Sequence, residues 1–331
     1  MTAALFSGFR ARFTSHLPRP SWLLIALCLA WSLPVGLLGG PSVVRAQDGD
    51  EDEEEEKIPE PESIVRQTKD GVRLAMTYYA STEGRDAVPV VCLHALEGSQ
   101  NRYTELALGL QQIGYAVLTV DLRGHGDSTQ VVGMRRELDA SRLSPDQIKA
   151  MVGSDMVTVT DFLWEKNNEE ELNMNRLCII GAEAGAVVAT NYAAFDWSIR
   201  DYGALQQGHF VKGLVLLSPP VRTKGLNIMQ ALQHPALLNA VAVMITFGKR
   251  DATAVRDAEQ IYKRLTGSGK QPEDPRERRV FAFGLNTQLQ GAKPLGQRVK
   301  LEQYIAGFLK LKLREATGPE YEWKELRKPH Q

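Results

Sequence analysis

Cysteine is scarce in this chain, which contains three in 331 residues. None stands in a Cys/His spacing typical of zinc sites, so we expect neither a metal ion nor an organic cofactor. Cys28 lies in an apolar segment near the start of the chain. Cys92 and Cys178 each lie inside an apolar, strand-like run, where cysteine behaves as a small hydrophobe. An oxidising compartment would permit a disulfide between them, but we expect two buried free thiols.

An excess of charge of either sign is also lacking, because the formal net charge at pH 7 is −1. The charges are nevertheless segregated near the N-terminus. Residues 1–46 contain arginines and no acid, whereas residues 47–56 read QDGDEDEEEE and contain no base. Basic and acidic side chains are close to balance in the remainder. Nothing resembles the basic stripe of a nucleic-acid-binding protein, so we expect no nucleic-acid partner.

A long apolar run occurs at residues 22–38, WLLIALCLAWSLPVGLL. Basic residues precede it, and the small residues Val44 and Ala46 follow, which is typical of a signal peptide cleaved after Ala46. We therefore predict export of the protein to the periplasm or the extracellular space. The alternative is a membrane anchor, because about 17 residues are the shortest span of a bilayer. We expect membrane contact only if the signal is uncleaved.

Four segments follow from this pattern: a signal peptide (1–46), an acidic linker (47–61), a folded domain (62–314) and a polar tail (315–331). The linker repels itself and buries no apolar surface, so we predict that it is disordered. The tail is polar, and we expect it to be loosely packed. Within the domain, strand-like and helix-like stretches alternate, which predicts an α/β fold with a mostly parallel sheet.

The expected strands are short and apolar. Residues 63–68 and 72–81 form a hairpin split by Asp70-Gly71, and the later runs, such as VPVVCLHA, are continuous, as for strands covered on both faces. In such folds ligands bind at the carboxyl ends of the strands. Three loops at these ends carry the candidate chemistry: HALEGS (94–99), DLRGHGDS (121–128) and GAEAG (181–185).

In this order and spacing, the three loops resemble those of the α/β-hydrolase superfamily, in its esterase, lipase and aminopeptidase-like branch. The resemblance covers about residues 62–314. It implies a mostly parallel central sheet of about eight strands with helices on both faces. It also implies motif loops at His94, Asp121, Arg123 and His125.

The family places its nucleophile in a sharp turn, G-x-S-x-G, between a strand and a helix. Gly181 and Gly185 match the glycines of that turn, and Glu183 stands where the resemblance implies a serine. Backbone N–H groups of Leu96 and Ala184 would form the oxyanion hole. A carboxylate at Glu183 would repel an oxyanion that forms beside it, which argues against ordinary acyl transfer.

The resemblance also implies positions for the acid and the base of a catalytic triad. Asp251, in ITFGKRDATAV, matches the acid, although an N-cap role for the following helix explains it equally well. Gln290-Gly291 stands where the family has His-Gly. Glutamine accepts no proton at neutral pH, and the only histidine after Asp251 is His330, in the tail.

Three functions remain open. The first is a non-catalytic binding or structural module with a degenerate triad, a pseudoenzyme, whose partner is a small molecule or a protein. The second is an active ester, epoxide or haloalkane hydrolase with Glu183 as nucleophile or general base, assisted by His94 or His125. The third uses Ser218 or Ser99 as nucleophile, although neither lies in a sharp turn of the required kind. An ion pair of Glu183 with Arg123, Lys224 or Lys293 would favour the first.

Overall fold

The computed structural model describes residues 57–267, 269 and 271–328. The predicted signal peptide, the acidic stretch 47–56 and His330 lie outside the described residues. None of the helices within the described ranges is both long enough and apolar enough to cross a bilayer.

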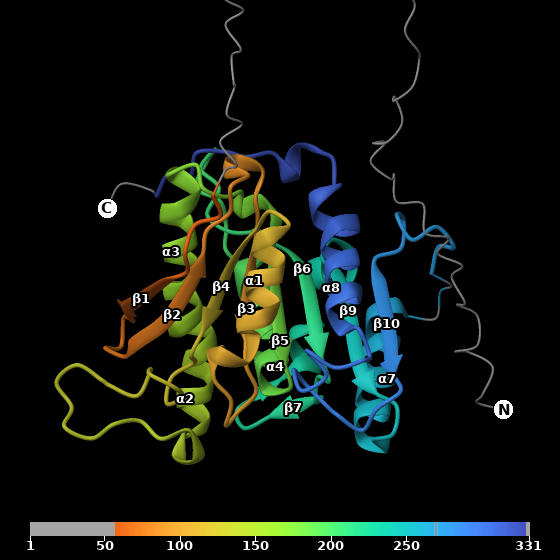
Figure 1. Cartoon of the computed structure of the whole chain (residues 1–331), viewed down its shortest axis with the longest axis horizontal. Helices are drawn as coiled ribbons and strands as arrows, with labels where there is room; N and C mark the ends of the chain where they lie inside the picture. Colours follow the sequence, from red (N-terminus) through yellow and green to blue (C-terminus); the bar gives the residue numbers. More distant parts are fainter. Residues whose placement is uncertain (1–56, 268, 270, 329–331) are drawn as a thin grey trace, which may run out of the picture. The chain divides into compact units, whose positions relative to one another are not determined.

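One eight-stranded sheet forms the centre of the domain, in the order β1-β2-β4-β3-β5-β6-β9-β10 (Figure 1). β1 and β2 form an antiparallel hairpin, β2 is antiparallel to β4, and all other neighbours are parallel. This confirms the predicted mostly parallel sheet of about eight strands with a hairpin at one edge. The strands are β1 (Glu62–Gln67), β2 (Arg73–Tyr79), β3 (Val88–Leu93), β4 (Tyr115–Val120), β5 (Leu177–Ala182), β6 (Val211–Leu217), β9 (Ala242–Gly248) and β10 (Val280–Leu285).

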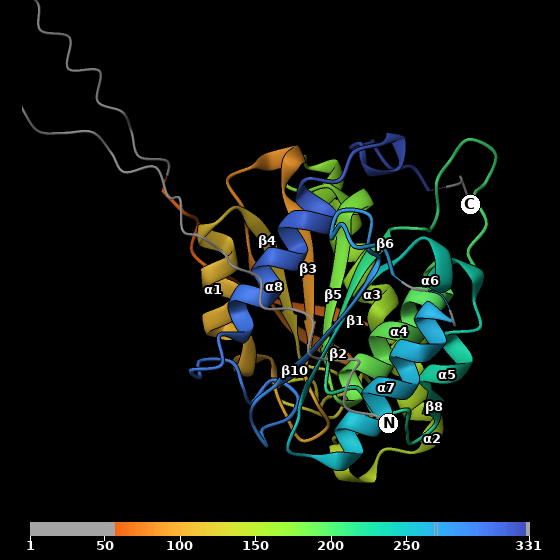
Figure 2. The ribbon, with the colours of Figure 1, turned by 90° about the vertical axis from the view of Figure 1, so that its right-hand side faces the viewer.

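The continuous apolar runs form the inner strands because helices cover both faces of the sheet. Every residue of β3, β4, β5, β6 and β9 is buried. Figure 2 shows α1 and α8 on one face, and α3, α4 and α7 on the other. The helices are α1 (Thr104–Gln112), α2 (Pro145–Ala150), α3 (Met156–Asn168), α4 (Ala184–Asp196), α5 (Ile228–Ala231), α6 (Pro235–Asn239), α7 (Ala252–Thr266) and α8 (Leu301–Leu309). A small hairpin, β7 (Arg222–Thr223) and β8 (Leu226–Asn227), follows β6.

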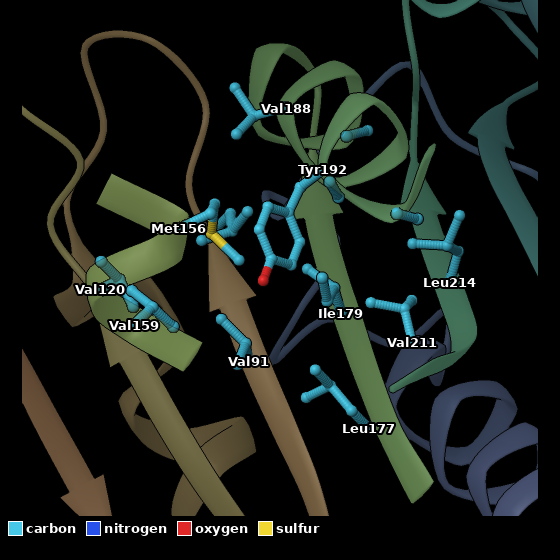
Figure 3. Close-up of a cluster of buried hydrophobic side chains, with 14 of the residues drawn as sticks. Val91, Val120, Met156, Val159, Leu177, Ile179, Val188, Tyr192, Val211 and Leu214 are labelled. Carbon is cyan, nitrogen blue, oxygen red and sulfur yellow. The ribbon is translucent and has the colours of Figure 1, made fainter. Parts of the chain in front are cut away.

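The two faces carry separate hydrophobic clusters, because successive side chains of a strand point to opposite faces. In β3, Val91 belongs to the cluster under α3 and α4, and Cys92 belongs to the cluster under α1 and α8. Figure 3 shows the first cluster, in which Val91 and Ile179 of the sheet lie beside Met156 and Tyr192 of the helices. The sheet is thereby held rigidly, which fixes the loops at its carboxyl edge.

The sequence predicts one helix over residues 145–165, and the structure divides it. The helix begins with a capping box between Ser144 and Gln147 and passes through a π-helical turn, Met151–Asp155, before α3. The turn places the buried carboxylate of Asp155 beside Arg123. The π-helical turn therefore contains Asp155, the carboxylate that pairs with the buried charge of Arg123.

Within the predicted loose tail, residues 321–326 are packed against the domain. Leu326 is 4 % exposed and belongs to the main hydrophobic cluster. The side-chain amide of Asn168 donates to the carbonyl of Leu326 (2.8 Å) and accepts from its N–H (2.9 Å). Asn167 donates to the carbonyl of Lys324 and Asn175 to that of Glu322. The tail packs through its main chain, which a polar sequence does not reveal.

The two cysteines of the domain are buried free thiols, as predicted. Both are fully inaccessible, and burial raises the pKa of each thiol. Neither thiol is available for redox chemistry at the surface.

Candidate active site

Glu183 stands in a sharp turn between β5 and α4. Its backbone has φ 49° and ψ −111°, a conformation that costs a side-chain-bearing residue about 1–3 kcal/mol and is concentrated at functional sites. Main-chain hydrogen bonds of the N–H and the carbonyl of Glu183 keep the residue in this strained conformation. Its N–H donates to the carbonyl of Leu217 (2.8 Å), and its carbonyl accepts from the N–H of Ala186 (3.0 Å).

The two glycines that flank this turn allow the main chains to approach closely. A Cβ on Gly185 would lie 2.5 Å from the carbonyl oxygens of Leu93 and His94, at the end of β3. A Cβ on Gly181 would lie 2.5 Å from the carbonyl oxygen of Gly185. The helix α4 therefore starts directly against the strand ends, and Glu183 is held at the carboxyl edge of the sheet.

The side chain of Glu183 is half-buried and packs against the main chain of Gly291, in the loop after β10. Within the described residues its carboxylate has no hydrogen-bond or ion-pair partner, and none of the suggested cations Arg123, Lys224 and Lys293 pairs with it. The buried phenol of Tyr103 lies nearby. Burial raises the pKa of Tyr103, and the charge of Glu183 raises it further.

Gln290 is fixed by hydrogen bonds at both ends of its amide. Its Oε1 accepts from the hydroxyl of Ser218 (2.6 Å) and from the N–H of Gly248 (3.1 Å). Its Nε2 donates to the carbonyls of Gly248 and Gln288, at 3.3 Å each. The assignment of oxygen and nitrogen follows this network. The structure places Gln290 next to Gly291, which contacts the side chain of Glu183.

Ser218 has a larger part in this corner than its sequence suggested. It directly follows β6, and its φ of 51° is also positive. The hydroxyl donates to Gln290 and accepts from the N–H of Gly291 (2.9 Å), so it links the ends of β6 and β10. The only signal in the sequence was a serine at a strand end, which gave no reason to choose this role.

Asp251 caps α7. Its Oδ1 accepts from the N–H groups of Thr253 (2.8 Å) and Ala254 (3.1 Å), as the capping interpretation predicted. Within the described ranges no hydrogen bond joins it to Gln290. Its N–H donates to the carbonyl of Gly248, which also contacts Gln290, so the two side chains belong to neighbouring turns.

His94 and His125 are buried and serve the loops. Nε2 of His94 accepts from the N–H of Leu122 (3.1 Å), so Nδ1 carries the hydrogen and donates to the carbonyl of Ala95 (2.7 Å). Burial lowers the pKa of His94 to about 4. Nδ1 of His125 donates to the carbonyl of Arg123, and its Nε2 is buried without a partner among the described residues. Neither ring hydrogen-bonds with Glu183 within these residues.

Asp121 joins two of the motif loops. Its Oδ1 accepts from the N–H of Gln100 (2.7 Å), and its Oδ2 accepts from the side chain of Gln100 and from the N–H of Asp127 (3.1 Å each). A Cβ on Gly126 would lie 2.2 Å from the same carboxylate. The aspartate and glycines of DLRGHGDS are therefore explained by loop packing.

Arg123 connects the loop after β4 to the β1–β2 hairpin and to the helical turn that contains Asp155. Its guanidinium forms ion pairs with Asp155 and with Asp70 of the β1–β2 hairpin, 2.6 Å each. Burial raises the pKa of Asp155, and the charge of Arg123 opposes the rise. For Asp70, burial is outweighed by hydrogen bonds from Arg123, Ser154 and Thr68, which lower the pKa. Arg123 is thus committed to structure rather than to Glu183.

The two expected oxyanion-hole positions lie on the loop after β3 and at the start of α4. Ala184 is the first residue of α4, where N–H groups have no partner within the helix. Leu96 is half-buried in the loop after β3, next to Glu97, whose φ is 67°. The contact of Gly185 with the carbonyl of His94 brings the loop and the helix start together. No cluster of three or more metal-ligating side chains is present in the described part of the chain.

The order of the strands and the glycine-flanked turn after β5 define an α/β-hydrolase fold. Residues 85–266 match the family model described as serine aminopeptidase, S33, and the chain belongs to this family. The match spans the strands and helices from the start of β3 to the end of α7.

Solved structures with the same fold are known esterases and hydrolases of low sequence identity. An esterase of Pyrococcus furiosus is 18 % identical, with a TM-score of 0.53 over 77 % of this chain and 91 % of that one. A dienelactone hydrolase of Anabaena variabilis is 17 % identical, with a TM-score of 0.54 over 77 % and 100 %. At these identities the likeness concerns the fold alone.

A curated relative is an uncharacterized protein of Mycobacterium tuberculosis, strain H37Rv. It is 33 % identical over 69 residues, which are 21 % of this chain. The match spans 25 % of the relative's own length.

Proposed function

We propose that the protein is an exported α/β-hydrolase-fold binding protein, in which Glu183 takes the place of the serine nucleophile and Gln290 that of the histidine base. Loss of individual triad members lowers turnover by factors of about 10⁴ to 10⁶ in serine hydrolases. With two members replaced, the carboxyl edge of the sheet serves to bind a small molecule or a protein segment.

The observation that carries this proposal is the bonding of Gln290. Its amide oxygen receives two hydrogen bonds and its amide nitrogen gives two, all within the loops that surround it. An amide so engaged holds the loop in place and accepts no proton from a nucleophile or from water. This bonding supports the proposal that Gln290 has a structural role at the position where the family resemblance implies a base.

The histidines of the motif loops support the same conclusion. A neutral His94 uses both ring nitrogens in hydrogen bonds to the main chain, and its low pKa keeps it neutral. His125 gives its Nδ1 hydrogen to a main-chain carbonyl. Recruitment of His94 as a base for Glu183 would require breaking these hydrogen bonds. Nε2 of His125 has no partner among the described residues, but it is buried and makes no hydrogen bond to Glu183 there.

One observation favours a second candidate function, an active ester, epoxide or haloalkane hydrolase that uses Glu183 as nucleophile or general base. The carboxylate is half-exposed and has no partner among the described residues. A carboxylate that acts as nucleophile or base must be within reach of the substrate or of water, and this one is not engaged elsewhere. Hydrolysis of a covalent ester on Glu183 would still need a group that activates water.

The experiment that separates the two functions is a substrate panel of short acyl esters, epoxides and haloalkanes. The purified protein is compared with Glu183→Gln, which keeps the shape of the side chain and removes its charge. We expect no turnover in either protein, with equal thermal stability showing that both are folded. Turnover that is present in the parent and lost in the variant would overturn the binding proposal and make Glu183 catalytic.

Export is tested separately, by the mass of the protein recovered from its producing cell. Cleavage after Ala46 would leave Gln47 as the first residue. An intact N-terminus in the membrane fraction would instead support an anchor through residues 22–38.

A further inference from the structure

β1 is an edge strand of the sheet, and among the described residues no strand pairs with its outer edge. It pairs with β2 along all six residues, Glu62 to Gln67, and the sheet ends there (Figure 1). Within the described residues, the main chain of β1 hydrogen-bonds to no element other than β2. The outward N–H and C=O groups of the strand are therefore available to another strand.

The side chains of β1 alternate between two environments. Ile64 is 7 % exposed and packs into the cluster under α3. Glu62 and Arg66 lie on the same face of β1, on either side of Ile64. Val65 points to the other face and is 51 % exposed, a large value for a valine in a strand. A hollow of about 250 Å³ runs along the strand between β1 and α3.

The two charged side chains of β1 make the strand complementary to itself. An antiparallel copy centred on Ile64 would place Glu62 opposite Arg66 of the second copy, and Arg66 opposite its Glu62. Directly opposite charges of unlike sign stabilise an antiparallel pair, and like charges destabilise it. Because these are the only charged residues of β1, this register alone pairs them.

We propose that β1 is an interface between two copies of this chain. The strands pair antiparallel about a twofold axis at Ile64, and the eight-stranded sheets join into one continuous sheet. Val65 then lies opposite Ser63 of the second copy and loses much of its contact with water. The interface uses the same patch on both copies, as a twofold dimer requires.

The other edge of the sheet does not offer the same match. β10 reads VFAFGL and carries no charged side chain that could fix a register. Arg66 already forms an ion pair with Glu165 (3.1 Å), but both side chains are about half exposed, so this bond competes weakly. Pairing of a six-residue strand buries less surface than a stable dimer needs, so we expect a weak, reversible dimer.

Sedimentation velocity over a wide range of protein concentration tests this interface and is independent of the chemistry at Glu183. We expect the parent protein to pass reversibly from monomer to dimer. Arg66→Glu alone and Glu62→Arg alone each place like charges opposite one another, and each should weaken dimerisation by roughly tenfold. The double variant Glu62→Arg/Arg66→Glu restores unlike pairs and should recover most of the parent affinity.

Two controls keep the outcome unambiguous. Glu165→Gln removes the ion-pair partner of Arg66, leaves its contact with the ring of Phe162 (5.5 Å), and should not weaken the dimer. Hydrogen exchange of the parent protein, which needs no variant, should slow in the peptide that spans residues 62–67 as the concentration rises. A parent protein that remains monomeric at every concentration, or a double variant as weak as the single ones, would overturn the proposal.

Discussion

The carboxylate of Glu183 rests directly on the main chain of Gly291. A Cβ at position 291 would lie 2.6 Å from Oε1 and 3.1 Å from Cγ of Glu183. Gly291 also has φ +58°, which a side chain adopts only with strain. The two loops that would carry a nucleophile and a base are thus packed against each other, and a large residue at 183 depends on glycine at 291.

Gly291→Ala should therefore destabilise the protein by about 1–3 kcal/mol, because it combines backbone strain with a clash against Glu183. Denaturant unfolding measures the loss. In the background of Glu183→Ala the clash is absent, so the same substitution should cost less there. Gly109→Ala is the matched control, since a Cβ on Gly109 in α1 meets nothing within 4 Å. Equal losses of stability in both backgrounds would show that the contact with Glu183 does not restrict which residue fits at position 291.

The tail is expected to contribute to stability through one apolar side chain and the amides that bind its main chain. Leu326→Ala should cost about 2–4 kcal/mol, because it removes a leucine buried in the main cluster. Asn168→Ala should cost about 1–2 kcal/mol, since the N–H and the carbonyl of Leu326 both lose their partner. Leu289→Ala serves as control, because Leu289 is 39 % exposed. A tail that packs only loosely would give losses no larger than that control.

The strands and most helices could be predicted because they depend on local patterns. The apolar runs around Val90, Ile179 and Val215 each became a fully buried strand. The turn at Glu183 was predictable for the same reason, because Gly181 and Gly185 are close in the sequence. Steric demands of that turn are local, so two glycines suffice to indicate it.

The remaining features depend on contacts between distant residues. Ser218 bonds to Gln290 across 72 positions, and nothing in either neighbourhood indicates the other. Asn168 and its neighbours bind main-chain atoms of the tail. Such bonds require no particular side chains in the tail, so its own sequence carries no pattern that indicates the packing. Leu326 was the one leucine in a mostly polar stretch. Such contacts follow from the assembled fold and leave no local signature.

Protonation of His94 should destabilise the protein in mild acid. Burial lowers its pKa from 6.5 to about 4, so the unfolded chain binds a proton between these values and the folded protein does not. The contribution of His94 to stability is therefore lost as the pH falls through this window, by up to about 1.4 kcal/mol for each pH unit. Free energies of unfolding at several pH values between 4 and 7 measure the slope.

His94→Gln removes the titrating group, so the slope in this window should become shallower in the variant. A neutral side chain at 94 loses hydrogen bonds at every pH, and this shifts the whole curve without changing its slope. Asp196 acts in the opposite direction, because burial raises its pKa to about 7 and makes stability fall as the pH rises from about 4 to 7. Asp196→Asn should therefore steepen the loss of stability in acid. An unchanged slope in His94→Gln would show that His94 is not the group responsible.

Restoring the two side chains that the family implies should restore part of the chemistry, if Glu183 and Gln290 occupy the positions of nucleophile and base. The variant Glu183→Ser/Gln290→His is expected to hydrolyse a short activated acyl ester at least about tenfold faster than either single variant, because triad members act as a unit. Removing the carboxylate of Glu183 also removes the charge that would oppose an oxyanion near the N–H of Ala184. Initial rates with p-nitrophenyl acetate, corrected for the reaction in buffer, measure the gain.

Adding Asp251→Asn to the double variant tests the third position, and the gain should fall if Asp251 orients the new histidine. A folded double variant no faster than Glu183→Ser would mean that position 290 does not reach the nucleophile, and Gln290 would then be part of the scaffold alone.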